Sequence, residues 1–196
     1  MTVDIPVVWI IVAAVAVLAG FAYWFWRWKG GRPVPEMLKP GRPLPEFQAV
    51  DEHGNRLSST DLAGSPAIIL FVRGSWCPFC SRQVADLTKL YKEITDCGAK
   101  LILVTPKPLE TTRRVADIFG VDFDFWLDES LDIAKKLGIF VEAAVPDEQR
   151  REYGEDTLWP TSLVIDADGI IRFTELSKIL VDRPDPAKLL NVVRNL

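Results

Sequence analysis

The sequence is poor in the residues that build metal centres and hydrolytic triads. It has one histidine, His53, and three cysteines in 196 residues. A histidine-based metal site or a Ser-His-Asp triad therefore lacks its raw material. Acidic residues outnumber basic ones, with 27 Asp and Glu against 23 Lys and Arg and a formal net charge of -4, and no basic patch is interleaved with aromatic residues. Nucleic acid is therefore not expected as a partner.

The beginning of the chain lacks charge. From Ile5 to Trp26 no charged residue occurs, and such an apolar run is long enough to cross a bilayer as a helix. A buried core helix and a cleaved signal peptide are the alternatives. Against a signal peptide, no Lys or Arg precedes the run and no small-x-small cleavage site follows it. We predict a transmembrane anchor over residues 1–28, with membrane contact through residues 5–26. Aromatic residues near both ends fit a membrane interface: Trp9, Tyr23, Trp24, Trp26 and Trp28.

The stretch after the apolar run is rich in proline and glycine. Five prolines and three glycines in residues 27–47 exclude a continuous helix or a central strand. We predict a spacer over residues 29–43 and a soluble domain over residues 44–196. The positive-inside rule favours the cytoplasmic side for this domain, and the external face is the alternative. No Lys or Arg precedes the span. Five basic residues follow it: Arg27, Lys29, Arg32, Lys39 and Arg42.

The soluble domain alternates between strand and helix patterns. Continuous apolar runs predict buried strands, helical periodicity predicts amphipathic helices, and Gly54-Asn55 and Asp168-Gly169 predict hairpin turns. The result is an α/β domain with a mixed central sheet flanked by helices. Residues 141–158 are polar and are interpreted as a surface insertion. The main predicted strands are 67–72, 99–105 and 122–127, and the main predicted helices are 77–95, 110–119, 130–137 and 185–196.

The chemistry is carried by the segment RGSWCPFCSRQ, residues 73–83, which contains Cys77 and Cys80. One such pair cannot complete a structural zinc site, which needs four ligands. A structural disulfide is also disfavoured, because a disulfide that closes so small a loop stabilises the fold very little. A cysteine at the start of a helix meets unpaired N–H groups that stabilise its thiolate. We therefore predict a redox pair in which Cys77 is the nucleophile and Cys80, one turn later, displaces whatever Cys77 has captured.

Three neighbours are candidate support residues for the pair. Pro78 suits the first helical turn because it lacks the N–H that would go unpaired there. Trp76 either flanks the sulfur or packs at the strand end. Arg73 either adds positive charge near the thiolate or is solvated. Cys97 follows the pair by about 20 residues, too far along a helix to join it, and is expected to be a half-buried free thiol.

Three segments resemble a known family: ILFVRGSWCPFC, WPTSLVID and DGIIRF. Together they resemble the thioredoxin-like superfamily, specifically its peroxiredoxin-like (AhpC/TSA, redoxin) branch, over essentially all of residues 44–196. The resemblance implies a thioredoxin-like fold and a redox-active disulfide between Cys77 and Cys80. It also implies that Trp159 and Pro160 are joined by a cis peptide bond that faces the cysteines and exposes the Trp159 backbone to an extended substrate.

The resemblance departs from true peroxiredoxins in two positions. Those proteins place a Thr or Ser three residues before the peroxide-attacking cysteine and a Pro seven residues before it. Counting back from Cys77 gives Gly74 and Leu70, and counting from Cys80 does not match either. Ser75 is the nearby hydroxyl and is a further candidate support residue.

These observations predict a membrane-anchored thiol-disulfide oxidoreductase. The alternatives are a peroxiredoxin-like antioxidant that reduces hydroperoxides and a non-catalytic tethered binding module. No metal and no organic cofactor is expected. The expected partners are a separate thiol reductant and either a disulfide-bearing protein or a peroxide substrate.

Overall fold

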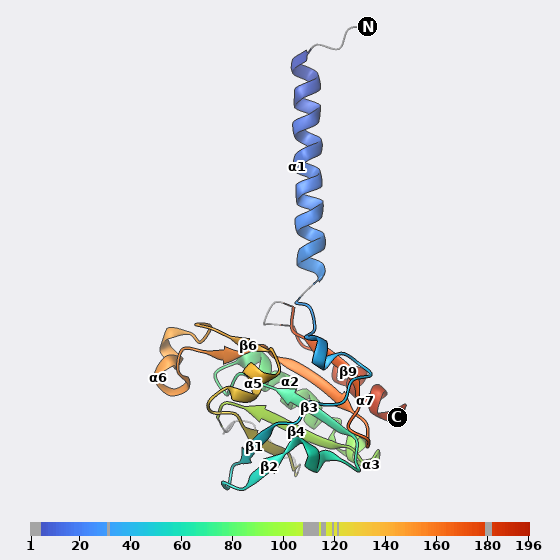
Figure 1. Cartoon of the computed structure of the whole chain (residues 1–196), viewed down its shortest axis with the longest axis vertical. Coiled ribbons are helices and arrows are strands. Elements are labelled where there is room, and N and C mark those ends of the chain that lie inside the picture. The colour runs from blue at the N-terminus through green and yellow to red at the C-terminus, as the bar shows by residue number, and fades with distance from the viewer. Residues whose placement is uncertain are drawn as a thin grey trace. The chain divides into compact units, whose positions relative to one another are not determined.

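The structure is a computed structural model that describes residues 5–30, 32–107, 114, 117–118, 120, 122–178 and 182–196. The chain divides into two units, Met1–Pro33 and Val34–Leu196. The described residues of the first unit include the helix α1, Ile5–Gly30 (Figure 1). Its segment Val8–Phe25 is long and apolar enough to cross a membrane by length and composition.

The second unit is built on a seven-stranded mixed sheet with the strand order β2-β1-β5-β4-β3-β8-β9. The central strands β3, β4 and β5 run parallel, whereas β1, β8 and β9 join antiparallel. This confirms the predicted fold class and both hairpins. The strands are β1 Gln48–Asp51, β2 Arg56–Ser58, β3 Ala67–Phe71, β4 Lys100–Thr105, β5 Asp124–Leu127, β8 Thr161–Ile165 and β9 Ile171–Leu176.

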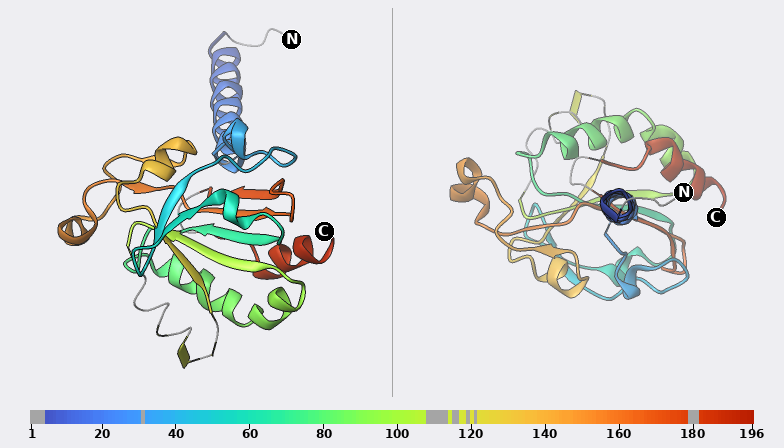
Figure 2. Two further views of the ribbon diagram at one scale, coloured as in Figure 1. Left: turned by 60° about the horizontal axis from the view of Figure 1, so that its bottom comes forward. Right: turned by 90° about the horizontal axis from the view of Figure 1, so that it is seen from above.

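Helices cover both faces of the sheet (Figure 2). One face carries α2 Pro78–Thr88, α3 Tyr91–Asp96 and α7 Pro186–Arg194, and the other carries α5 Asp132–Lys136 and the short helices η1 Glu36–Leu38 and η2 Ser59–Leu62. Alternate residues of β3 enter the two hydrophobic cores: Ile69 packs in one and Ile68 in the other. Double-sided burial explains why β3 is an unbroken apolar run.

The helix predicted over residues 77–95 is two helices, α2 and α3. The chain bends after Thr88, whose Oγ1 donates to the Val84 carbonyl at 3.0 Å and so offers the backbone an alternative to the regular helical pattern. Cys97 follows the end of α3 and is exposed, so the expectation of a half-buried thiol was wrong. The helix predicted over residues 110–119 lies for the most part outside the described residues.

Part of the predicted spacer is integrated into the second unit. Residues 34–44, called here the strap, pack on the start of β9. Leu38 is fully buried, the Gly41 amide donates to the Ile171 carbonyl at 2.7 Å, and the Ile171 amide donates to the Arg42 carbonyl at 2.9 Å. The strap forms no continuous helix and no central strand, as expected, and its helical part is limited to the short η1. Its other backbone groups are free to hydrogen-bond to the sheet.

The polar insertion predicted over residues 141–158 has structure of its own. Its base is a two-stranded sheet of β6, Phe140–Val141, and β7, Thr157–Leu158. Between these strands, residues 142–156 form a projection called here the arm, which contains η3 Asp147–Gln149 and α6 Arg150–Tyr153 (Figure 1).

Candidate active site

The two cysteines lie where β3 leads into α2. Cys77 is the N-cap residue of α2, and Pro78 occupies the first helical turn, where its missing N–H costs no hydrogen bond. The Cys77 carbonyl accepts the amides of Cys80 at 3.0 Å and Ser81 at 3.2 Å. The two sulfur atoms lie 2.9 Å apart, with the Cys80 thiol donating to Cys77 Sγ. This turn of helix therefore holds the two thiols at reaction distance.

The two thiols differ in acidity. The hydrogen bond from Cys80 is the main cause that lowers the pKa of Cys77 to about 6, and the charges of Arg183 and Arg73 add to it against an opposing effect of burial. The pKa of Cys80 is raised because its proton is engaged with Cys77 and its sulfur is fully buried. Cys77 is consequently the thiolate of the pair and Cys80 the protonated thiol.

Arg183 brings a positive charge to both sulfur atoms. Its Nη2 lies 3.1 Å from Cys80 Sγ and 3.6 Å from Cys77 Sγ. Its Nη1 donates to Ser177 Oγ at 2.9 Å and to the Asp182 carbonyl at 2.6 Å. Sequence reasoning missed this residue because it follows Cys77 by 106 positions. The sequence around Arg183 has no pattern that indicates contact between the segment before α7 and the cysteines of α2.

Arg73 supplies the second guanidinium and is buried rather than solvated. It lies 4.3 Å above the centroid of the Trp76 ring and donates to the Ala144 carbonyl of the arm at 2.5 Å. Burial lowers the pKa of Arg73, and the negative charge of the cysteines opposes that effect. Trp76 thus forms the platform that holds this charge beside the cysteines.

The arm covers the loop that precedes the cysteines. Tyr153 of α6 shares a hydrogen bond of 2.7 Å with Ser75 and packs edge to face on Trp76, with ring centroids 6.4 Å apart. Gly74 has φ +122, and a Cβ there would lie 2.5 Å from the Tyr153 ring. The segment interpreted as a surface insertion is therefore part of the site, and its polar sequence gave no periodic signal of this.

The Trp159–Pro160 peptide bond is trans, so the prediction of a cis bond was wrong. Both residues precede β8 at the end of the sheet where Thr161 pairs with Phe71, the end that carries the cysteines. The trans bond keeps the chain extended, so the Trp159 amide donates to the Ile139 carbonyl at 2.6 Å and the Pro160 carbonyl accepts from Ser177 at 2.9 Å. These internal bonds engage the backbone that was expected to face a substrate.

A buried polar pair fixes α2 against the sheet. Gln83 Nε2 donates to Ser162 Oγ at 3.0 Å, and both side chains are buried. Gln83 lies three residues after Cys80 and therefore on the same side of the helix. Sequence reasoning did not identify it, although a polar residue on an apolar helix face is a signal for such a contact.

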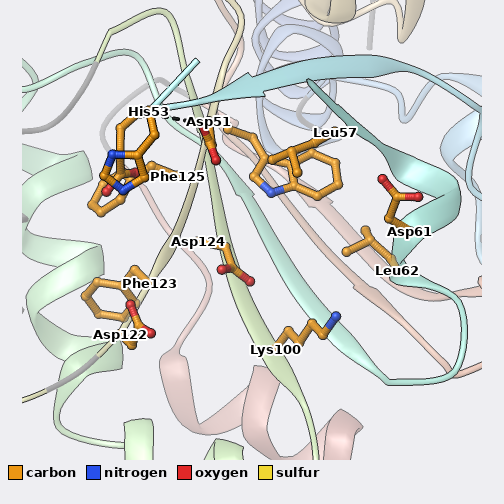
Figure 3. A pocket seen from close by; sticks show the side chains of 12 residues that line it. Asp51, His53, Leu57, Asp61, Leu62, Lys100, Asp122, Phe123, Asp124 and Phe125 are labelled. Atoms are coloured by element: carbon orange, nitrogen blue, oxygen red, sulfur yellow. Dashed lines mark hydrogen bonds between the residues drawn. The ribbon is translucent and has the colours of Figure 1, made fainter. Parts of the chain in front are cut away.

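The described residues contain no group of three or more His, Cys, Asp or Glu side chains that could hold a metal ion. A cavity of about 310 Å³ lies elsewhere, between the β1–β2 hairpin and the starts of β4 and β5 (Figure 3). Its lining includes Asp51, His53, Lys100 and Asp124 but neither Cys77 nor Cys80. It lies at the opposite end of the parallel strands, because Lys100 and Asp124 begin β4 and β5.

Comparisons with known proteins find thiol-disulfide oxidoreductases and peroxiredoxins among the relatives of this chain. The AhpC/TSA family matches residues 40–174. The thiol-disulfide oxidoreductase ResA of Halalkalibacterium halodurans is 28% identical over 104 residues, which are 53% of this chain and 58% of that protein. The peroxiredoxin Bcp of Escherichia coli is 25% identical over 134 residues, 68% of this chain and 83% of that protein.

Two solved structures share the fold. Peroxidoxin BcpB of Mycobacterium tuberculosis superposes with a TM-score of 0.64 at 19% identity, covering 81% of this chain and 98% of that chain. A putative thiol:disulfide interchange protein DsbE of Chlorobium tepidum gives a TM-score of 0.57 at 19% identity, covering 81% and 97%.

Proposed function

The chain belongs to the AhpC/TSA family, and we propose that within this family of redox enzymes it is a membrane-anchored thiol-disulfide oxidoreductase. The observation that carries the proposal is the Cys77–Cys80 pair, with a sulfur–sulfur distance of 2.9 Å and one acidic thiol beside one protonated thiol. This asymmetry suits a nucleophile and a resolving thiol that act in succession.

The reaction has two displacement steps. The Cys77 thiolate attacks one sulfur of a substrate disulfide, and the other sulfur leaves as a thiolate that takes a proton from water. Cys80 then loses its proton and attacks Cys77 Sγ, which breaks the mixed disulfide and releases the second substrate thiol. The substrate disulfide gains two electrons, and the enzyme is left with a Cys77–Cys80 disulfide. A separate thiol reductant, the expected partner, restores the dithiol.

Buried donors beside Cys77 support binding of a disulfide-bearing peptide. Arg73 Nε and Trp76 Nε1 are buried and have no hydrogen-bond partner within the described part of the chain. An unpaired buried donor is costly, and a substrate carbonyl oxygen would satisfy it. Cys77 is only 2% exposed, so binding must also displace side chains that cover it.

Hydroperoxide reduction is the second candidate function. The family relatives named peroxiredoxins and the guanidinium of Arg183 beside Cys77 favour it. The hydroxyl of Ser75 does not, because Tyr153 engages it and Gly74 occupies the position of the peroxide-orienting Thr or Ser.

The proposed anchor is α1, and the proposed side for the second unit is the cytoplasmic one, given the lysines and arginines that follow the span. The external face is the alternative. A reporter protein fused after Leu196 and tested with external protease in intact cells distinguishes them. Resistance without lysis supports the cytoplasmic side, and digestion contradicts it.

The function is tested by trapping the intermediate in the full-length protein. Cys80→Ser leaves the Cys77 nucleophile intact but removes the resolving thiol, so mixed disulfides should accumulate in membranes and appear as reducible adducts by mass spectrometry. Cys97→Ser is the matched control, because it removes an exposed cysteine remote from the helix start and should trap nothing. Absence of adducts from Cys80→Ser contradicts the proposed mechanism.

A further inference from the structure

The resolving step requires a buried thiol to ionise, and the sequence around the cysteine pair contains no evident base for it. Cys80 must become a thiolate before it can attack, yet it is fully buried, and burial opposes ionisation. The strand beneath it, β3, contains no carboxylate that could accept the proton. Cys80 Sγ contacts Cys77 Sγ and the guanidinium of Arg183, and a backbone hydrogen bond from Arg73 also favours its ionised form.

The state of the pair changes when the mixed disulfide forms. In the free dithiol, Cys80 keeps its proton chiefly because it donates that proton to the Cys77 thiolate. In the mixed disulfide, Cys77 Sγ is bonded to the substrate and has no negative charge, so this cause disappears. The Arg183 guanidinium, 3.1 Å from Cys80 Sγ, is then a positive charge within hydrogen-bond distance of the sulfur about to ionise, and the buried Arg73 guanidinium adds a second, through-space attraction.

We propose that Arg183 is a catalytic residue of the resolving step, where it stabilises the Cys80 thiolate that attacks the mixed disulfide. The inference rests on the proposed function and deepens it. Arg183 acts by its charge and accepts no proton in this step; the Cys80 proton passes to water or to the departing substrate thiolate. The Cys80–Cys77 bond forms as the bond from Cys77 to the substrate breaks.

The position of Arg183 fits stabilisation of the Cys80 thiolate better than stabilisation of the Cys77 thiolate alone. Nη2 lies nearer to Cys80 than to Cys77, and Nη1 is held by Ser177 Oγ and the Asp182 carbonyl. The guanidinium group of Arg183 is therefore already in position and does not need to reorganise during the resolving step. By microscopic reversibility Arg183 also stabilises Cys80 as the leaving thiolate when the donor thiol reduces the oxidised pair.

A chromogenic disulfide separates the two steps. Full-length protein in detergent, with Cys97→Ser in every sample, is reduced and mixed in a stopped-flow instrument with dithiobisnitrobenzoate. The first coloured thiolate is released when Cys77 attacks, and the second is released when Cys80 resolves the adduct. We expect Arg183→Gln to slow the second release roughly tenfold to a hundredfold, the range for a lost charge-assisted hydrogen bond, and the first release less.

Two variants make the comparison specific. Arg183→Lys keeps the charge and should recover part of the second rate, which a purely structural role would not predict. Arg82→Gln removes an exposed arginine of α2, the helix that carries Cys80, with an 83% exposed side chain, and should leave both rates unchanged. An unchanged second rate in Arg183→Gln, or slowing of the first release alone, overturns the inference. If the protein with Arg183 intact releases no second thiolate, the proposed function itself fails.

Discussion

The acidity of Cys77 gives the sharpest prediction about the resting site. With a pKa of about 6 in place of 9.0, Cys77 is about nine-tenths thiolate at pH 7, compared with about one-hundredth at the ordinary value. The largest cause is the hydrogen bond from the Cys80 thiol. Replacing Cys80 by alanine removes that donor and leaves the helix start and both guanidinium groups in place.

The expected size follows from the bond that is lost. A hydrogen bond to a charged group contributes about 1.5–3 kcal/mol, so Cys80→Ala should raise the pKa of Cys77 by about one to two pH units. Arg183→Gln should raise it less, because the charge of Arg183 is a smaller cause than the thiol. Comparing the pKa of Cys77 in the two variants therefore tests whether the Cys80 thiol lowers that pKa more than the Arg183 charge does.

The assay is the rate of iodoacetamide alkylation against pH, with thiolate absorbance as a second readout. All proteins contain Cys97→Ser, because the exposed Cys97 would react as well. The midpoint must be compared rather than a single rate, since a thiolate of higher pKa is intrinsically more nucleophilic. A midpoint near 9 with Cys80 present, or no movement in Cys80→Ala, would refute this reasoning.

Three further predictions concern the arm, the oxidant and pH. Gly74→Ala should displace Tyr153, lower the melting temperature and speed alkylation of Cys77, whereas Gly54→Ala, also at positive φ but facing open space, should lower stability only. The reduced protein should react with hydrogen peroxide no faster than free cysteine at equal thiolate fraction; a far higher stopped-flow rate would establish the peroxidase alternative. Because the folded pKa of Cys77 is about 6, below the unfolded value, the unfolded chain binds more protons between pH 6 and about 8.5. Calorimetry should therefore show the reduced protein gaining stability as pH rises through this window, and Cys77→Ser losing that gain.

The parts of the molecule that the sequence predicted correctly depend on local patterns. β3 was predicted because both of its faces are buried and every residue is apolar. The pairing of Cys77 with Cys80 follows from one turn of helix, and the start of α2 follows from Pro78. In each case the physical cause acts over a few neighbouring residues and is therefore visible in a short stretch of sequence.

The parts that were missed depend on contacts across the fold. Arg183 reaches the cysteines only because the segment before α7 returns to α2, and Tyr153 reaches Ser75 only because β6 and β7 close the base of the arm. The cis bond at Pro160 was inferred from family resemblance, and the extended hydrogen bonding of this chain favours trans instead. The break after Thr88 reflects a competing side-chain hydrogen bond that leaves the apolar periodicity intact.

The strap has a consequence for self-association. β9 is the last strand of the sheet, and the free edge of a terminal strand is a template on which another chain can add a strand. The strap occupies the outward-facing amide and carbonyl of Ile171 and buries Leu38, so it protects the start of that edge from aggregation. A soluble fragment that begins at Val34 retains this protection, whereas one cut at Leu44 exposes both the edge and the apolar site beneath Leu38.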